Sequence, residues 1–223
     1  MPQDVLARMN KAGVIPIVVI EDPSKIVQLG KSILEAGLDL IEITMRTERA
    51  MEALKTISTE LPQMVVGAGT VFSVPVAKEA LSVGARFIVS PHLDERIVTY
   101  CARKNVVCIP GVFTPSEVQR AISAAKKGMP RKSIEDLPLV IKIFPASTGG
   151  PGHIAAMKAV FPEVRFLPLG GVNAVNVAEY IKGGAWAVGG TWLCKRDLIE
   201  SGNFAKISEL VKEALAAIAT ARK

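Results

Sequence analysis

Short apolar segments alternate with amphipathic segments along the whole chain, and this alternation restricts the fold more than any other feature. Eight segments have the length and composition of buried strands, and each is followed by a segment with helical periodicity. The expected strands are 14–20, 39–44, 64–68, 86–90, 106–109, 139–144, 165–168 and 185–189. The expected helices are 23–36, 48–60, 74–83, 94–104, 115–127, 152–160, 174–183 and 203–221. Eight strand–helix units in 223 residues predict an α/β fold, a (β/α)8 TIM barrel at the small end of its size range.

Three junctions between helix and strand share a weak repeat, which supports this arrangement. Residues 36–41, 83–88 and 183–188 each end a helix at a glycine and then enter a strand. Glycine suits the left-handed conformation that often follows the last turn of a helix. An open, doubly wound sheet is the main alternative, but no GxGxxG motif follows the first expected strand to favour it.

No linker or break in composition divides the chain, so residues 1–223 are expected to form a single domain. Hydrophobic residues make up 49% of the sequence, which is enough for one large core. Residues 1–11 lack the apolar centre of a secretion signal and predict a short amphipathic N-terminal helix. No run of about 18 or more apolar residues occurs, so neither a membrane span nor a membrane partner is expected.

Charge and cysteine content narrow the classes of partner. The formal net charge is +6, and part of the excess lies in the segment with Lys126, Lys127, Arg131 and Lys132. Aromatic residues are not interleaved with these cations, which argues against a nucleic-acid groove. A solvated basic surface that mildly attracts an anionic small substrate is expected instead. The three cysteines show no CxxC spacing, so we expect free thiols in a reducing cytoplasm, with neither zinc nor disulfides.

One of the expected strands contains a lysine. Lys142 stands at the centre of the apolar run 140–144, with an isoleucine on each side. Burial of an unpaired ammonium is costly, so such a lysine is either paired or displaced toward the neutral amine. A neutral amine attacks a ketone and forms a Schiff base. The alternative is a lysine at a strand end that reaches water or bridges to a loop.

The expected strand 39–44 places further polar groups in the same interior. Period-two alternation puts Glu42, Thr44 and Arg46 on the face toward the barrel axis, and Lys142 faces inward by the same logic. A carboxylate, a guanidinium and an amine that converge in a low-dielectric interior indicate a reactive site. Mutual pairing of these charges, without chemistry, is the alternative.

Paired glycines follow the last two expected strands. Gly170 and Gly171 come after the seventh strand, and Gly189-Gly190 leads from the eighth strand to Thr191. Paired glycines let backbone N–H groups approach an anion, and the loops after strands 7 and 8 are the usual phosphate site of barrels. The pattern therefore predicts phosphate binding here, with tight turns that bind no ligand as the alternative.

Six segments reproduce, in order and spacing, the motifs of one enzyme family: 40–48, 66–71, 88–91, 109–111, 142–146 and 170–171. They closely resemble the class I aldolases for 2-keto-3-deoxy-6-phosphogluconate (KDPG) and 4-hydroxy-2-oxoglutarate (KHG). The similarity extends over nearly the whole chain, from Val14 to Leu193. The resemblance implies a homotrimer that acts on a small 2-keto acid and needs no metal or other cofactor.

The resemblance also implies roles for the matching positions. Lys142 is expected to form the Schiff base, and Glu42 is expected to act as general acid and base. The residues implied to bind the pyruvate part of the substrate are Arg46, Thr70, Pro91 and Phe144. The residues implied to bind the phosphate are Gly170, Gly171 and Thr191. The implied reaction is cleavage of KDPG to pyruvate and glyceraldehyde 3-phosphate.

Four features depart from the family pattern. Leu169 occupies the place of the threonine that usually precedes the glycine pair, which is expected to reduce hydrogen bonding to substrate hydroxyls. His92 stands where many members have glycine, and we interpret it as a cap for the helix that begins near Asp94. His153 is expected at the surface. The polar segment 128–138 is expected to form a surface insertion longer than in common bacterial members.

These departures leave several functions open. Within the same chemistry, the substrate is alternatively 4-hydroxy-2-oxoglutarate or a 2-keto-3-deoxygalactonate-type compound, with or without phosphate. A phosphosugar isomerase or epimerase would need acid–base pairs but no imine-forming lysine. A non-catalytic phosphosugar-binding barrel would gain little from a buried amine.

Overall fold

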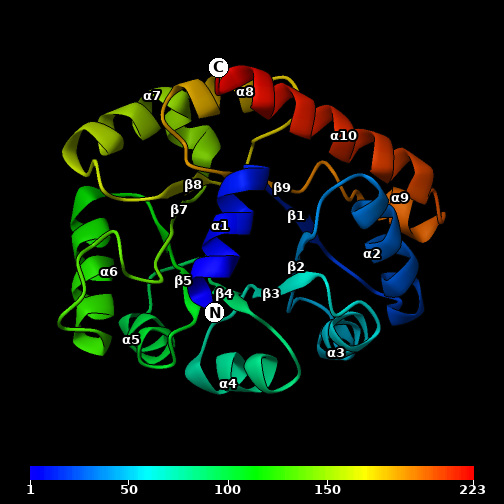
Figure 1. Cartoon of the computed structure of the whole chain (residues 1–223), viewed down its shortest axis with the longest axis horizontal. Coiled ribbons are helices and arrows are strands. Elements are labelled where there is room, and N and C mark those ends of the chain that lie inside the picture. Colours follow the sequence, from blue (N-terminus) through cyan, green and yellow to red (C-terminus); the bar gives the residue numbers. More distant parts are fainter.

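Helices surround a central set of parallel strands in this computed structural model, which describes residues 1–223 (Figure 1). The strands are β1 (Val14–Val18), β2 (Leu40–Thr44), β3 (Val65–Gly69), β4 (Phe87–Val89), β5 (Val107–Ile109), β6 (Gly111–Val112), β7 (Ile141–Ile143), β8 (Phe166–Pro168) and β9 (Val188–Gly190). The helices are α1 (Pro2–Ala12), α2 (Ile26–Glu35), α3 (Ala50–Glu60), α4 (Val74–Ser82), α5 (Glu95–Arg103), α6 (Pro115–Gly128), α7 (Ala146–Val160), α8 (Val177–Lys182), α9 (Arg196–Glu200) and α10 (Phe204–Ala221), with a 3-10 helix at Pro23–Lys25. Every expected strand and helix has a counterpart, so the predicted alternation is confirmed.

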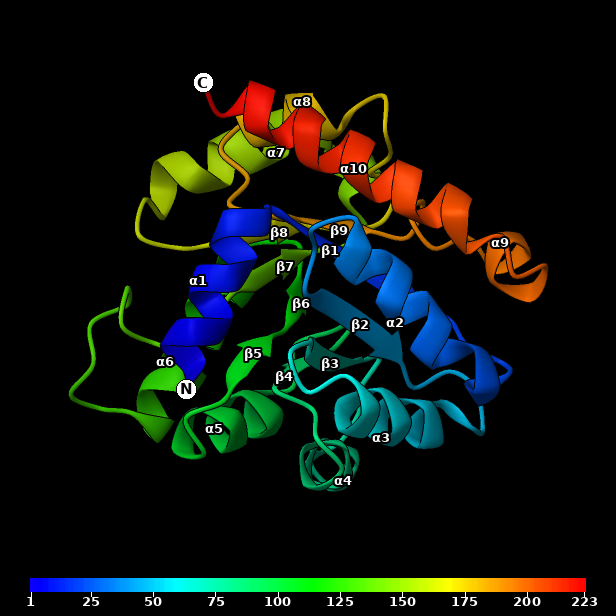
Figure 2. The same cartoon turned by 45° about the vertical axis from the view of Figure 1, so that its right-hand side comes forward.

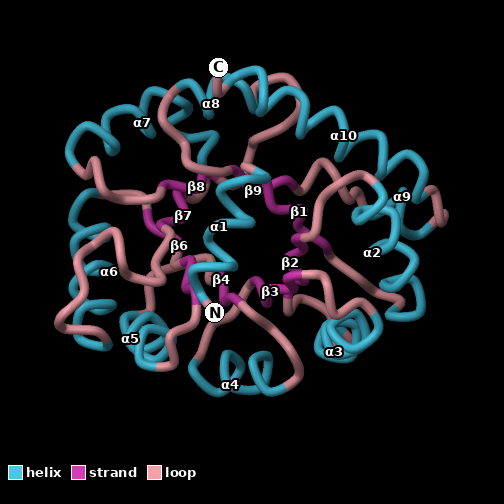
Figure 3. Tube along the Cα trace, viewed as in Figure 1, coloured by secondary structure: helices cyan, strands magenta, loops and turns pink.

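The strands form two parallel sheets that curve around the centre of the molecule. The larger sheet has six strands in the order β5-β4-β3-β2-β1-β9, and the smaller has three in the order β6-β7-β8. β1 lies between β2 and β9, with Val14 aligned with Val188. Figure 3 shows the strands on a curved path with helices outside it. The α/β architecture with a curled parallel sheet is therefore confirmed.

The chain passes from the larger to the smaller sheet at a proline. β5 ends at Ile109, and β6 begins after Pro110, so the expected strand 106–109 is followed by a short strand that was not predicted. Proline has no backbone N–H to continue a ladder. Its carbonyl oxygen still accepts a hydrogen bond from the N–H of Lys142 at 3.0 Å. Pro110 thereby links the end of one sheet to the strand that carries the lysine.

Two helices differ from the sequence prediction. The helix expected at 152–160 begins at Ala146, and α9 was not predicted. α7 is interrupted at Gly150 (φ 63°, ψ −168°), which precedes Pro151, so it consists of two helical segments joined by a kink. A Gly-Gly-Pro run indicates a loop, and this signal concealed the first segment. α9 has five residues, too few for a periodicity signal.

The polar segment 128–138 is exposed along most of its length, as expected, but its end enters the core. Leu137 and Pro138 are buried, and the Arg165 guanidinium donates to the carbonyl oxygen of Leu137 at 3.2 Å. The N–H of Cys108 donates to the carbonyl oxygen of Pro138 at 2.9 Å. The prediction of a surface insertion is therefore wrong for its last two residues, because Leu137 is buried beside Arg165 and Pro138 accepts a hydrogen bond from β5.

Capping side chains mark the starts of three helices next to strand ends. Ser73, Asp94 and Thr114 each accept a hydrogen bond from a backbone N–H two or three residues further on. One cluster of 71 buried hydrophobic residues fills the space between the helices and the strands. None of the helices combines the length and apolar character needed to cross a membrane.

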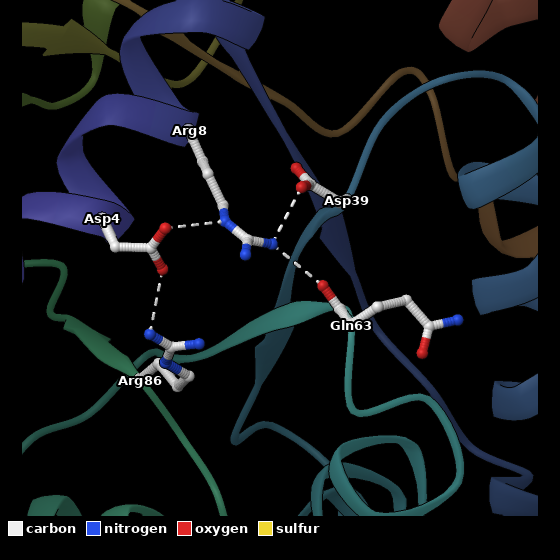
Figure 4. Close-up of polar contacts among 5 residues, drawn as sticks. All are labelled: Asp4, Arg8, Asp39, Gln63 and Arg86. Carbon is white, nitrogen blue, oxygen red and sulfur yellow. Dashed lines mark hydrogen bonds and ion pairs between the residues drawn. The ribbon is translucent and has the colours of Figure 1, made fainter. Parts of the chain in front are cut away.

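α1 lies across one end of the strands and is tied there by charged groups (Figures 1 and 2). Arg8 donates to Asp39 at 2.9 Å, to Asp4 at 3.2 Å and to the carbonyl oxygen of Gln63 at 3.0 Å. Arg86 donates to the second oxygen of Asp4 at 3.1 Å (Figure 4). Individual surface pairs contribute little to stability, but this network joins α1 to the segments that enter β2, β3 and β4.

Candidate active site

Glu42 and Lys142 are buried charged side chains that share the space enclosed by the strands. Their exposed fractions are 3% and 5%. Glu42 on β2 is aligned with Gly67 on β3, and Lys142 on β7 is aligned with Gly111 on β6. Each of the two charges shifts the pKa of the other, although they belong to different sheets. The two residues are thus brought together as the period-two pattern predicted.

Burial displaces the pKa of both groups toward neutrality. Loss of hydration raises the pKa of Glu42 to about 7, although the positive charges of Lys142 and Arg46 oppose the increase. Loss of hydration lowers the pKa of Lys142; the Glu42 carboxylate opposes this decrease, and Arg46 adds to it. None of the ion pairs in the structure includes these three residues. A carboxyl group with a pKa of about 7 exchanges protons near neutral pH, and a lowered pKa increases the neutral fraction of the amine.

Phe144 supplies an aromatic face beside the amine. Lys142 Nζ lies 4.6 Å from the centroid of the Phe144 ring, which is half-buried. A ring at this distance stabilises the protonated amine and provides an apolar surface for the neutral amine. Phe144 therefore lies near the lysine, as expected.

Arg46 lies at the rim of the site rather than in its interior. It follows the end of β2 in a turn, is exposed, and donates from Nε to Thr70 Oγ1 at 3.3 Å. The expectation that Arg46 faces a low-dielectric interior is wrong, because the strand ends at Thr44 and alternation stops there. Thr70 has φ 59°, a left-handed conformation that is unfavourable for threonine and typical of functional sites. The two residues are nevertheless brought together as predicted.

Thr44, the third polar residue predicted on the inner face, serves the backbone. It is buried, and its hydroxyl donates to the carbonyl oxygen of Val18 at 3.0 Å. This bond uses the hydroxyl proton and links β2 to β1, so Thr44 has no free donor for a ligand.

An interior glycine makes room for the carboxylate. A Cβ on Gly69 would lie 1.9 Å from Glu42 Oε1, whereas a Cβ on Gly67 would lie 2.1 Å from the ring of the buried Phe87. Glutamate can swing away from such a methyl group, but a buried aromatic ring has no free space to enter. The two glycines of β3 therefore have different roles. Gly69 leaves room for the Glu42 carboxylate, and Gly67 leaves room for the packing of Phe87 in the core.

Gly69→Ala is expected to displace the Glu42 carboxylate and lower turnover strongly. The variant is expected to fold and to be nearly as stable as the parent protein. Gly67→Ala, its matched control, is expected to destabilise the fold by about 1–3 kcal/mol because it overpacks the core. Steady-state kinetics and urea unfolding of both variants separate the two effects. Full activity in Gly69→Ala would contradict the assigned position of the acid.

The glycine pair after β8 forms a turn, whereas the second glycine pair lies within β9. Gly170 and Gly171 have φ 88° and 91°, a region that favours glycine. Gly189 and Gly190 belong to β9 and are buried, and Thr191 follows them as an exposed residue. The expectation that this pair follows the last strand as a loop is wrong, because these glycines continue the sheet.

Ser147 is a candidate that the sequence patterns missed. Its N–H donates to the carbonyl oxygen of Gly170 at 2.8 Å, and its Cβ lies 2.5 Å from the position of a Cβ on Gly171. The hydroxyl therefore adjoins the glycine turn that was expected to bind phosphate. The signal that could have identified Ser147 is its position in the first turn of the helix that directly follows the lysine strand.

Leu169 is buried and reaches over β9. A Cβ on Gly189 would lie 2.6 Å from a methyl group of Leu169 and 3.0 Å from one of Ile17. These two apolar side chains converge over Gly189, next to the Gly170-Gly171 turn. Neither of these side chains can form a hydrogen bond with a hydroxyl group.

Pro91 and the two histidines lie around the same end of the strands. The carbonyl oxygen of Pro91 lies 2.4 Å from the position of a Cβ on Gly111, the residue aligned with Lys142. His92 is exposed and stacks on Phe72, with ring centroids 5.5 Å apart. Its interpretation as a helix cap is wrong, because Asp94 caps that helix with its own carboxylate.

His153 is less exposed than expected. It is half-buried, and Nε2 lies 2.9 Å from the carbonyl oxygen of Phe113, on whose ring the imidazole stacks at 4.6 Å. The expectation of a simple surface residue is therefore wrong, since the kink in α7 turns this part of the helix toward the end of β6.

The largest cavity of the molecule lies elsewhere. It has a volume of about 640 Å³, lies between α1, α2 and α10, and includes neither Lys142 nor Glu42. We identify the candidate active site from its perturbed acid and amine rather than from cavity size, because reactive chemistry requires such groups.

The chain matches one protein family over most of its length. The family model "KDPG and KHG aldolase" matches residues 5–210. A 2-dehydro-3-deoxy-phosphogluconate aldolase of Pseudoalteromonas atlantica is 33% identical over 219 residues, which cover 97% of this chain and 95% of that protein. The KHG/KDPG aldolase of Escherichia coli K12 is 31% identical over 204 residues, covering 91% and 90%.

Solved structures show the same similarity. KDPG aldolase from Legionella pneumophila, with pyruvate captured as a covalent carbinolamine intermediate, has a TM-score of 0.85 and 29% identity, covering 96% of this chain and 98% of that one. KDPG aldolase from Zymomonas mobilis, with 3-phosphoglycerate, has a TM-score of 0.81 and 32% identity, and 97% of each chain is covered.

Proposed function

The chain belongs to the family of KDPG and KHG aldolases, and from this premise we propose that Lys142 and Glu42 cleave KDPG to pyruvate and glyceraldehyde 3-phosphate. The observation that carries the proposal is the pair of buried groups whose pKa values are displaced toward each other. The amine is displaced toward its neutral, nucleophilic form, and the carboxyl titrates at about 7. An isomerase would not need this lysine.

Lys142 begins the reaction as a nucleophile. Its neutral amine adds to the C2 ketone, and loss of water gives an iminium cation. This cation accepts the electron pair of the C3–C4 bond when that bond breaks. The depressed pKa of Lys142 increases the fraction of neutral amine at neutral pH, and the Phe144 ring supports the cationic intermediate.

Glu42 moves the protons. Its carboxylate removes the proton of the C4 hydroxyl as the aldehyde forms, and the pyruvate enamine remains on Lys142. Glu42 then returns a proton to C3, and water hydrolyses the iminium to free pyruvate and the amine. One carboxyl group serves both steps because its pKa of about 7 leaves both protonation states populated at neutral pH.

Arg46 and Thr70 hold the pyruvate end of the substrate in this proposal. Their contact at 3.3 Å leaves the terminal nitrogens of the guanidinium available for a carboxylate. Arginine binds a carboxylate in a planar, bidentate geometry that lysine does not provide. Pro91, beside β6, forms a wall near the lysine strand.

The phosphate pocket in this proposal consists of Gly170, Gly171 and Thr191, together with Ser147. The positive φ angles of the two glycines and the serine hydroxyl beside them support it. Backbone N–H groups and hydroxyls are typical phosphate donors.

Thr191→Val is expected to raise KM for the phosphorylated substrate about tenfold, because a hydrogen bond to a charged group is lost. KM for pyruvate, measured by exchange of its C3 protons, is expected to stay unchanged. Thr191 is exposed, so the fold tolerates the change. Equal effects on both constants would remove Thr191 from the phosphate pocket.

We also propose that residues 1–223 form one closed (β/α)8 barrel. Backbone hydrogen bonds at both places where the larger sheet meets the smaller one support the closure of the barrel. Val140 N donates to Cys108 O at 3.0 Å, and Trp186 N donates to Phe166 O at 2.9 Å. The family resemblance supports a homotrimer, and three buried free cysteines are compatible with a reducing cytoplasmic location.

A second substrate is favoured by Leu169. Substrate hydroxyls placed against Leu169 and Ile17 would lose water without gaining a partner. A 2-keto acid with fewer hydroxyls, such as 4-hydroxy-2-oxoglutarate, avoids part of this loss. A 2-keto-3-deoxygalactonate-type compound keeps these hydroxyls but places the one on C4 in the opposite configuration. Relative kcat/KM on these compounds and KDPG decides between them.

The first test is incubation with pyruvate and borohydride, followed by intact mass and peptide mapping. One reduced-pyruvate adduct on Lys142 is the expected result. Absence of an adduct on folded protein would overturn the proposal and favour an isomerase or a binding protein.

A further inference from the structure

We infer that the cavity beneath α1 binds a small amphipathic organic anion, a carboxylate with an apolar body. This cavity lies at the opposite end of the strands from the proposed active site. Asp39 in its lining directly precedes β2, whereas Arg46 at the active-site rim follows the end of β2. Its volume of about 640 Å³ is within the usual range for small-molecule sites.

Positive charge predominates in the lining. Arg8, Lys11 and Arg222 contribute three cations, and Asp39 contributes the single carboxylate. Asp39 is already engaged, because it accepts a hydrogen bond from Arg8 at 2.9 Å (Figure 4). The cavity therefore keeps a positive excess that favours an anion.

Both arginines are held in place by the protein and retain a free donor. Arg8 uses Nε and Nη1 for Asp4, Asp39 and Gln63, which leaves Nη2 without a protein acceptor. Arg222 donates from Nη1 to the carbonyl oxygen of Asn10 at 2.6 Å and from Nη2 to that of Trp186 at 2.8 Å. Its Nε has no protein acceptor.

This arrangement reduces the entropy cost of binding. Arg8 and Arg222 are already oriented, so a ligand does not have to immobilise two long side chains. Lys11, which is exposed and bonds to no protein group, adds a mobile third cation. A carboxylate accepts several such N–H donors at once.

The remaining wall is aliphatic and open. The apolar lining residues are Ala12, Leu34, Leu38, Leu215, Ile218 and Ala219. Gly37 adds open space, because a Cβ placed there would meet nothing within 4 Å. A hydrocarbon chain or small ring fits this wall, whereas a sugar phosphate would find no hydroxyl-binding groups there. The ligand class is therefore an aliphatic or aromatic carboxylate.

Octanoate is a suitable probe, with octanamide as its uncharged match. Isothermal titration is expected to show saturable binding of octanoate to the full chain and at least tenfold weaker binding of octanamide. Lys11→Gln is expected to weaken octanoate binding about threefold, the effect of one exposed ion pair. Lys212→Gln removes one exposed positive charge from α10 outside the cavity lining and is expected to leave binding unchanged.

A steric variant completes the test. Ala219 is exposed on α10, so Ala219→Phe narrows the cavity without disturbing the core and is expected to abolish octanoate binding. Unchanged binding in Ala219→Phe, or equal binding of octanamide, would overturn the inference. A change of oligomeric state in Ala219→Phe, seen by light scattering, would show instead that a second copy covers the cavity. The borohydride trapping at Lys142 is independent of all these outcomes.

Discussion

Lys142→Met is expected to abolish both the pyruvate adduct and turnover, with a loss of at least about 10⁴-fold, the scale seen when a covalent nucleophile is removed. Methionine has a similar length and no amine, so it fills the space in the strand without forming an imine. Mass spectrometry after borohydride treatment and a coupled assay of pyruvate release measure the two losses. Lys55→Met, at an exposed position on α3, is the matched control and is expected to keep both. A retained adduct in Lys142→Met would identify a different nucleophile.

The same variant is expected to be more stable than the parent at neutral pH. The pKa of Lys142 is lowered by folding, so the unfolded chain binds more protons in the range between the depressed pKa and the ordinary value of 10.5. The native state therefore carries an energetic penalty at neutral pH that disappears as the pH approaches 10.5. Thermal unfolding at pH 7 and at alkaline pH measures this difference. A less stable variant at pH 7 would mean that packing around the methylene chain outweighs desolvation.

Glu42→Gln is expected to lower the exchange of pyruvate C3 protons about 10²- to 10⁴-fold, the usual contribution of a general acid–base group. Glutamine preserves the shape of the side chain but does not transfer a proton. The borohydride adduct on Lys142 is expected to form still, so imine formation and proton transfer are separated. Deuterium exchange followed by NMR gives the rate. Unchanged exchange would remove Glu42 from its proposed role.

Glu42→Gln also has a defined effect on stability. Folding raises the pKa of Glu42 from 4.5 to about 7. The unfolded chain thus loses this proton first, and native stability falls as the pH rises from 4.5 through about 7. The shift corresponds to about 3 kcal/mol, and the variant is free of this penalty. Urea unfolding at pH 5 and pH 8 is expected to show a stability gain for Glu42→Gln at pH 8 that is larger than at pH 5.

The alternation of strands and helices, and the two groups at the centre of the site, were predictable from local patterns. Lys142 and Glu42 each interrupt an apolar strand, and alternation with a period of two is strict enough to assign the face on which they lie. The same rule failed at Arg46, because alternation holds only while the strand continues, and Arg46 lies two residues beyond the strand end at Thr44. The prediction of a loop at Gly189-Gly190 failed for the converse reason, because the strand continues through both residues. Glycine permits a turn but also permits a close strand contact, here with Leu169.

Contacts between distant segments were not predictable from one sequence. Arg8 and Asp39 are 31 residues apart, and Arg222 and Asn10 are 212 residues apart. No local periodicity relates such positions, so the network beneath α1 and the cavity beside it became visible only in three dimensions. Ser147 was missed for a related reason, since its importance depends on the distant Gly170-Gly171 turn.

The position of β1 in the larger sheet affects how this chain is made. β1 is complete at Val18, but its partner β9 begins only at Val188. One edge of β1 therefore has to wait for its partner while about 170 residues are synthesised. At about 5–20 residues per second, that wait during translation lasts roughly 9–34 s. An unpaired strand edge recruits strands from other chains. The nascent chain therefore passes through a period in which this edge of β1 has no partner strand.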